Sequence, residues 1–341
     1  MNTLEASAEV VRKAPVAVLD RRRVLHGLER YALVLLLGAL ILFFTLLPAT
    51  GDTFLTVANI RNVAANEAVI AIAALGALVP LVAGEFDVSI GAVLGMVSIA
   101  VAALTHRAGL PLIVALPAGV ALGAAVGAVS GFIVAYLRAG SFIITLGMAT
   151  FIAGLVSLYT KDQVILGIPQ SMVDFGTLNW LGVPRPVWLL LIMALLVAYL
   201  LRYTVFGRHL VSIGSNTRSA ALVGIRVPLV VMLSFVVAGA LAAVAGELEL
   251  ARTGSGSPQI GPGFTLSALA AVFLGSTTIR PGQFNVPGTI VGVFFVAVSV
   301  NGLTLAGAAD WVDPLFNGAA VVVAVAVSTV LAHRRGAAAT R

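Results

Sequence analysis

The densest group of reactive side chains lies in one short segment, residues 84–91, with the sequence Gly-Glu-Phe-Asp-Val-Ser-Ile-Gly. A carboxylate at the centre of a bilayer costs roughly 2.5–3.5 kcal/mol, so two carboxyl groups beside an apolar run are either interfacial or functional. Two roles suit them: Asp87 or Ser89 caps the following helix, or the carboxylates contact a solute. Capping is favoured, and both roles are compatible if a helix is broken within the membrane. The candidate residues are Gly84, Glu85, Asp87, Ser89 and Gly91.

The composition shows that membrane helices must position these groups. The chain has 341 residues, of which 60% are hydrophobic and 10% charged, whereas soluble domains are about 45–50% apolar and about 25% charged. A soluble enzyme and a disordered chain are therefore both excluded. Apolar runs of about 20 residues recur along the sequence, which predicts an all-α, polytopic membrane protein.

Ten apolar segments are predicted to be transmembrane helices. The eighth is too short to cross about 30 Å of hydrocarbon as a straight helix, and it follows the Gly/Pro-rich stretch 254–263. It is therefore expected to be a half-helix fed by a re-entrant loop. The ten segments are residues 31–49, 64–83, 88–105, 110–136, 141–160, 186–203, 228–250, 264–276, 284–306 and 314–332.

The basic residues predict the orientation of these helices. If the N-terminus lies inside, most of the 20 Lys and Arg residues fall on the inner side. Both termini are then cytoplasmic, in accordance with the positive-inside rule. The same rule accounts for the net charge of +6, so no nucleic-acid partner is expected and the lipid bilayer is the expected surroundings. The predicted organisation is a cytoplasmic segment 1–30, a permease domain 31–332 with an internal loop 204–227, and a cytoplasmic tail 333–341.

The residue types also exclude several kinds of chemistry. There is no cysteine, and the four histidines are far apart in the sequence. The chain contains no Gly-Lys-Ser or Gly-Lys-Thr phosphate loop. We therefore expect no catalytic residue, no metal site and no cofactor in this chain.

A regular spacing of glycines predicts how one of the helices packs. Gly119, Gly123, Gly127 and Gly131 recur at every fourth residue, which places them on one stripe of a helix where a neighbouring backbone can approach closely. Packing within one subunit is favoured over a dimer interface.

A second pattern is a similarity between two short segments. Residues 282–288 (Gly-Gln-Phe-Asn-Val-Pro-Gly) resemble residues 84–91 with one residue deleted, which indicates an internal repeat.

The internal loop is expected to hold a short helix. Asn216 or Thr217 can cap a helix containing residues 219–223, and Gly224 can end it. A short helix along the inner surface suits docking to a soluble partner, and an amphipathic connector is the alternative. The candidate docking residues are Gly207, Arg208, Gly214, Asn216, Ala220, Ala221 and Gly224.

Several motifs, in order along the chain, are similar to those of a known family. They are residues 84–91, 141–147, 207–225 and 251–255, followed by 269–275 and 301–303. Through them the chain resembles the ribose-type permease subunit (branched-chain/monosaccharide class) of bacterial ABC importers over nearly its whole length. It departs from the family pattern at Glu85-Phe86, where a glycine–hydrophobe pair is usual, and at Ser141, where proline is usual.

The resemblance implies a non-hydrolysing permease in the bacterial plasma membrane that imports a sugar or a similar polar small molecule. It implies a second permease subunit (homo- or heterodimer), cytoplasmic ATPase subunits that bind ATP with magnesium, and an extracytoplasmic solute-binding protein. The internal loop would dock the ATPase. The alternative is a proton- or sodium-coupled secondary transporter that uses Glu85 and Asp87.

Overall fold

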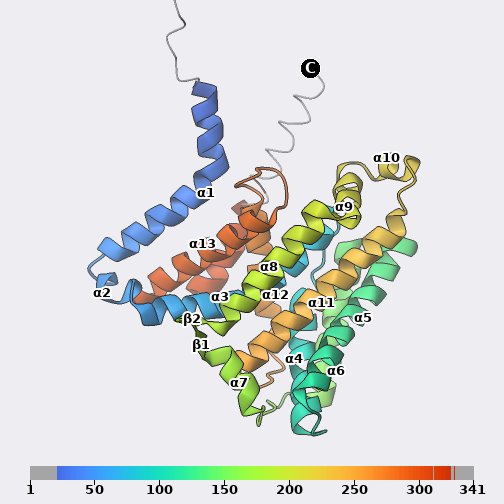
Figure 1. Cartoon of the computed structure of the whole chain (residues 1–341), viewed down its shortest axis with the longest axis horizontal. Coiled ribbons are helices and arrows are strands. Elements are labelled where there is room, and N and C mark those ends of the chain that lie inside the picture. Colours follow the sequence, from blue (N-terminus) through green and yellow to red (C-terminus); the bar gives the residue numbers. More distant parts are fainter. Residues whose placement is uncertain (1–20, 310, 324–325, 327–341) are drawn as a thin grey trace, which may run out of the picture.

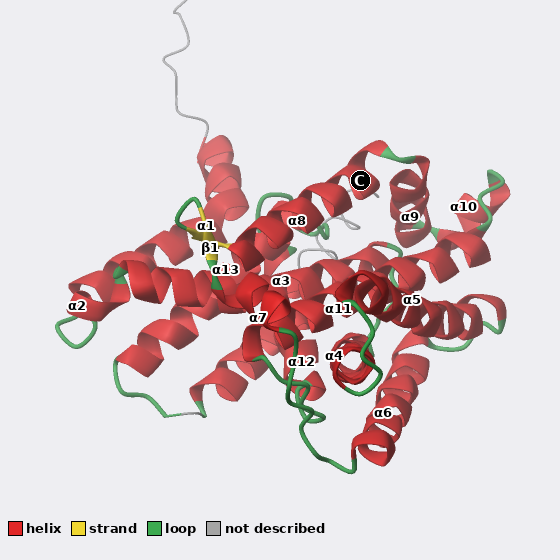
Figure 2. Cartoon of the chain, turned by 60° about the horizontal axis from the view of Figure 1, so that its bottom comes forward, coloured by secondary structure: helices red, strands yellow, loops and turns green. Residues whose placement is uncertain are grey.

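The computed structural model describes residues 21–309, 311–323 and 326, and it is helical almost throughout (Figures 1 and 2). Of the predicted segment 1–30, residues 1–20 lie outside the described residues. The predicted tail 333–341 lies wholly outside them. Six described helices are long and apolar enough to cross a membrane: α3 (Val57–Val82), α5 (Leu112–Tyr136), α6 (Ser141–Thr160), α8 (Arg185–Tyr203), α11 (Val227–Thr253) and α13 (Val286–Leu305).

Four shorter apolar helices complete the bundle among the described residues. They are residues Arg30–Leu46 of α1 (Arg21–Leu46), then α4 (Ile90–His106), α12 (Gly261–Gly275) and the helix Val312–Val323. The all-α polytopic fold is therefore confirmed, with one apolar helix in each predicted segment. The first helix differs from the prediction because α1 begins ten residues before the predicted start at residue 31.

The other elements are short and connect the membrane helices. They are α2 (Gly51–Phe54), α7 (Gln170–Thr177), β1 (Asn179–Trp180), β2 (Val183–Pro184), α9 (Val205–Ser215) and α10 (Thr217–Leu222). β1 and β2 form an antiparallel hairpin. Because α8 joins the hairpin to α9, the α7–hairpin region and the α9–α10 region lie at opposite ends of the molecule (Figure 1).

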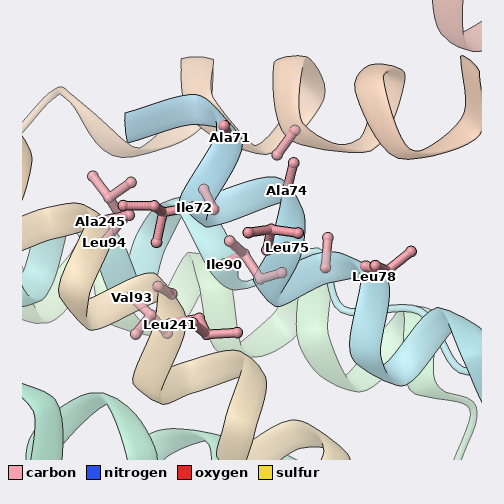
Figure 3. Packing of buried hydrophobic residues seen from close by; sticks show 14 of the residues in the cluster. Ala71, Ile72, Ala74, Leu75, Leu78, Ile90, Val93, Leu94, Leu241 and Ala245 are labelled. Atoms are coloured by element: carbon pink, nitrogen blue, oxygen red, sulfur yellow. The ribbon is translucent and has the colours of Figure 1, made fainter. Parts of the chain in front are cut away.

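The core of the fold is α3, which is buried on nearly all sides. Figure 3 shows Ala71, Ile72 and Leu75 of α3 beside Leu94 of α4 and Ala245 of α11, and all five side chains are fully buried. Alanine and glycine make up much of this surface, so the helix backbones approach closely. Gly76 of α3, for example, lies against the backbone of α11 near Ala238.

The glycine stripe of α5 packs against α11 of the same chain. A Cβ atom at Gly123 would overlap the carbonyl oxygen of Gly239, and one at Gly127 would overlap that of Phe235. Gly119 and Gly131 follow the same face, against Glu247 and Met232 respectively. The structure thus places the stripe in intramolecular packing, the arrangement that the sequence favours.

The structure relocates the internal repeat. α3 and α11 begin at residues 57 and 227, each is followed by a glycine of positive φ at 84 and 254, and each next helix has Ile-Gly at its start, 90–91 and 260–261. All of these pairs differ by 170 in residue number. The segment 282–288, which the sequence pairs with 84–91, precedes α13 rather than α12 and so lies outside this 170-residue register. Its similarity to 84–91 reflects shared turn chemistry, a left-handed glycine followed by an Asp or Asn.

Candidate functional site

The first part of the candidate site is a break between α3 and α4. α3 ends at Val82 and α4 begins at Ile90, which leaves residues 83–89 outside any helix. Pro80 lies in the last turn of α3, and Gly84 then takes a left-handed conformation (φ 87°) that residues with a side chain rarely adopt. The broken helix predicted around these residues is present.

The first turn of α6 satisfies the freed backbone donors of this break. The N–H of Phe86 donates to the hydroxyl of Ser141 (3.1 Å), and the N–H of Val88 donates to the hydroxyl of Thr145 (3.1 Å). Both hydroxyl residues are buried, and an unpaired backbone donor would be costly there. The sequence shows both residues only as part of the family motif 141–147. Their contact with the break is a tertiary feature.

Asp87 and Ser89 form a compact buried pair. The Oδ1 atom of Asp87 accepts from the backbone N–H of Ser89 (2.9 Å) and from its hydroxyl (2.6 Å). Asp87 is only 3% exposed. Glu85, in contrast, is half-buried. Asp87 therefore stabilises the turn that leads into α4.

The side chain that caps α4 comes from another helix. The N–H of Gly91, in the first turn of α4, donates to the hydroxyl of Thr265 (3.1 Å) on α12, whereas the side chain of Ser89 caps nothing. The prediction that Asp87 or Ser89 caps this helix is therefore wrong for this donor. The reason is the proximity of the two helix starts, because a Cβ atom at Gly91 would overlap the carbonyl oxygen of Gly261.

The loop before α12 runs back along α4, as a re-entrant loop would. Gly256 lies against Ile99 and Ala102 in the second half of α4, and it pairs with Ile165 through two backbone hydrogen bonds of 2.9 Å. Five residues later Gly261 has reached the start of α4. The short α12, of 15 residues, thus begins beside Gly91 rather than at the level where α4 ends.

The second part of the candidate site is the segment α9–α10. Asn216 accepts from the N–H of Ser219 (2.9 Å) and caps α10, while Gly224 follows with φ 86°. The capped short helix predicted here is confirmed. α9 is an additional helix of 11 residues that the prediction of a loop missed, and its side chains Leu210 and Ile213 are buried.

The predicted docking residues fall into two groups. Gly207 and Ala220 are buried, and a Cβ atom at Gly207 would overlap the carbonyl oxygen of Leu201 at the bend from α8 into α9. The others are exposed at the surface of α9 and α10. They are Arg208, Gly214, Asn216, Ala221 and Gly224.

Gly214 joins the two parts of the site. A Cβ atom at this position would overlap the carbonyl oxygen of Val82, the last residue of α3. α9 therefore contacts the backbone at the start of the helix break. A cavity of about 610 Å³ opens here, lined by Gly84, Gly214 and Arg202 among others.

The turn before α13 lines the same cavity and resembles the first turn in its contacts. Asn285 caps α13 by accepting from the N–H of Gly288 (2.8 Å). Phe273 of α12 lies between the two turns, with ring centroids 6.1 Å from Phe86 and 5.7 Å from Phe284. The two turns thus meet at the C-terminal end of α12, and α9 lines the cavity beside them.

Broken helices that meet at the centre of a polytopic helical bundle are typical of membrane transport proteins. Residues 59–325 match the family described as the permease component of branched-chain amino acid transport systems. The chain belongs to this family of transport permeases, and the predicted ribose-type relationship is confirmed.

Three relatives are similar along most of their length. The ribose import permease of Escherichia coli K12 is 34% identical over 304 residues, covering 88% of this chain and 93% of the relative. The D-allose transport permease of the same organism is 27% identical over 89% and 92%. The autoinducer 2 import permease of Salmonella typhi is 30% identical over 82% and 80%. No solved structure matches the chain significantly.

Proposed function

We propose that this chain is the permease subunit of an ATP-driven importer for a sugar or a similar polar small molecule. Family membership and the ribose and D-allose permeases among its relatives support this assignment. In the proposed importer a separate cytoplasmic ATPase binds ATP with magnesium, an extracytoplasmic protein delivers the solute, and a second permease subunit completes the pathway. Both termini of the chain are then cytoplasmic, as the basic residues predict.

The contact between Gly214 and the end of α3 is the observation that carries the mechanism. Because the glycine leaves no gap against the Val82 carbonyl, a displacement of α9 must push the end of α3. The next residues are the left-handed turn at Gly84 and the irregular segment 85–89. Loop residues at helix ends can absorb such a displacement as a change in φ and ψ. The proposed ATPase would therefore act on the meeting point of α4, α6 and α12.

The tip of the α9–α10 segment offers a surface for the ATPase. Leu222 and Val223 are 83% and 78% exposed at the end of α10, just before α11 begins at Val227. Apolar side chains exposed together on a polar surface are typical of protein–protein contacts. The capped helix α10 holds them in a fixed direction, whereas a flexible loop would not.

The experiment replaces Gly214 with valine in the permease co-expressed with its ATPase. The added side chain must separate α9 from α3 while leaving Leu222 and Val223 in place. We expect the ATPase still to co-purify and ATP-dependent uptake to fall. Ser212→Val is the matched control, because Ser212 is exposed on the same helix, whereas Gly214 is the position whose Cβ would overlap the Val82 carbonyl oxygen. Wild-type uptake by Gly214→Val would contradict the proposed transmission, and loss of uptake in both variants would show that the effect is unspecific.

A further inference from the structure

A second polar cavity lies at the other half of α3, away from α9. It has a volume of about 220 Å³ and is bounded by α3, α12, α13 and the helix Val312–Val323. Its wall is unusual for a membrane helix bundle because it carries carboxyl and amide groups. Its polar residues are Asn62, Asn66, Glu67, Ser267, Asn301, Thr304, Asp313 and Asn317.

Internal hydrogen bonds account for only part of this polar wall. Asn59 and Asn301 bond each other through their side-chain amides (2.9 and 3.2 Å). Arg252, at the end of α11, donates to the side-chain oxygen of Asn66. These contacts hold α3 against α11 and α13 and leave the cavity itself open.

Asn317 supplies an acceptor with no partner. Its amide nitrogen donates to Asp313 (2.5 Å), but its Oδ1 atom has no hydrogen-bond partner among the described residues, and the residue is only 5% exposed. A buried polar atom left unpaired is destabilising, so such atoms in native proteins need an explanation. An incoming hydrogen-bond donor would satisfy it. Glu67 and Asp313 line the same cavity with further acceptors.

We propose that this cavity is a solute subsite that binds a small neutral polyhydroxylated molecule during import. The inference rests on the proposed function. Carboxyl oxygens accept hydrogen bonds, asparagine amides both donate and accept, and a hydroxyl group can pair with either. An apolar amino-acid side chain would leave these groups unpaired, which selects strongly against it. The volume is below the roughly 300–1,000 Å³ of drug-sized ligand sites, which restricts the solute to a small molecule.

The location of the cavity fits a pathway through the bundle. α3 connects the cavity with α9. Glu67 lies in the first half of α3, and Gly214 of α9 contacts the last residue of α3. Ser267 of α12 also lines the cavity, and the neighbouring Thr265 bonds the start of α4. A movement at the helix break would therefore reach the wall of the subsite through α3 and α12.

The test measures uptake in proteoliposomes that contain the complete importer, with D-ribose, D-allose and L-leucine as probes. The variants are Asn317→Leu and the nearly isosteric Glu67→Gln, which keeps the test valid if the first variant does not fold. Asn179→Leu, in the exposed hairpin, is the matched control. We expect both cavity variants to lower kcat/KM for ATP-dependent sugar uptake by about tenfold, the scale of one lost hydrogen bond to a buried group, and the control to be unchanged.

The outcomes separate the two proposals. If the wild-type importer accumulates sugar with ATP but Glu67→Gln and Asn317→Leu import it with wild-type efficiency, the subsite is refuted and the proposed function stands. A wild-type preference for L-leucine over both sugars also refutes the polyhydroxylated class. If the wild-type complex imports none of the probes with ATP, the proposed function fails and the subsite fails with it.

Discussion

Replacing Thr265 with valine removes one hydroxyl and almost no volume from the junction of α4 and α12. That hydroxyl accepts from the N–H of Gly91 (3.1 Å) and lies 3.5 Å from the carbonyl oxygen of Val88. Thr265 is buried, so neither group gains water in exchange. Leaving a buried donor unpaired costs about 1–3 kcal/mol. Thr265→Ser keeps the hydroxyl and loses one methyl group, which costs about 0.8 kcal/mol.

The assay measures the thermal unfolding midpoint (Tm) of the purified permease in detergent. The loss of the monodisperse peak is the readout of unfolding. One kcal/mol corresponds to about 2–4 °C for chains of 150–250 residues, so Thr265→Val should lower Tm by roughly 2–12 °C. Thr265→Ser should lower it by less, roughly 2–3 °C. If valine is tolerated as well as threonine, or better than serine, packing rather than the hydrogen bond to Gly91 holds the junction and our reasoning is refuted.

Three further variants test other parts of the structure. Asp87→Asn should retain near wild-type folded yield because its amide oxygen still accepts from Ser89, whereas Asp87→Leu should lose about 1–3 kcal/mol and fold poorly; equal yields would contradict this. Gly127→Leu should cost at least about 1–3 kcal/mol by forcing α5 away from α11, seen as a lower Tm, while Gly154→Leu, with open space at its Cβ, should not. Asn216→Ala should weaken the cap of α10 by about 0.5–2 kcal/mol and reduce co-purification of the ATPase, and Asn216→Asp should restore it.

The features that the sequence predicts correctly depend on local pattern. Long apolar runs define the membrane helices because lipid requires every backbone group to be paired within a segment. The cap at Asn216 and the end at Gly224 follow from the chemistry of two side chains within one short helix. The glycine stripe of α5 indicates close packing, but its partner, α11, cannot be read from spacing alone.

The features that the sequence misses depend on contacts between distant segments. Thr265 reaches Gly91 across 174 residues, and Ser141 reaches Phe86 across 55. α9 was missed because a short, polar and amphipathic helix has no long apolar run to mark it. The polar cavity was missed for a related reason, since Asn66 and Asn317 lie in segments far apart in the sequence and only the fold brings them together.

Glu247 and Glu249 show the same limit. Near the end of an apolar segment both are expected to reach the interface, which is the usual behaviour of charged groups there. In the structure Glu247 instead lies against Gly119 of α5, and its Oε1 atom is buried. The glycine stripe leaves room for this carboxyl group, which the sequence of α11 alone does not show.

The most direct test of the proposed function is solute accumulation in proteoliposomes that contain the purified chain. D-ribose is offered with the subunit alone under an imposed proton or sodium gradient, and then with the ATPase, the binding protein and MgATP added. We predict no accumulation by the chain alone and ATP-dependent accumulation by the complete system. Gradient-driven accumulation by the chain alone, abolished by Glu85→Gln or Asp87→Asn, would contradict the account and identify a secondary transporter.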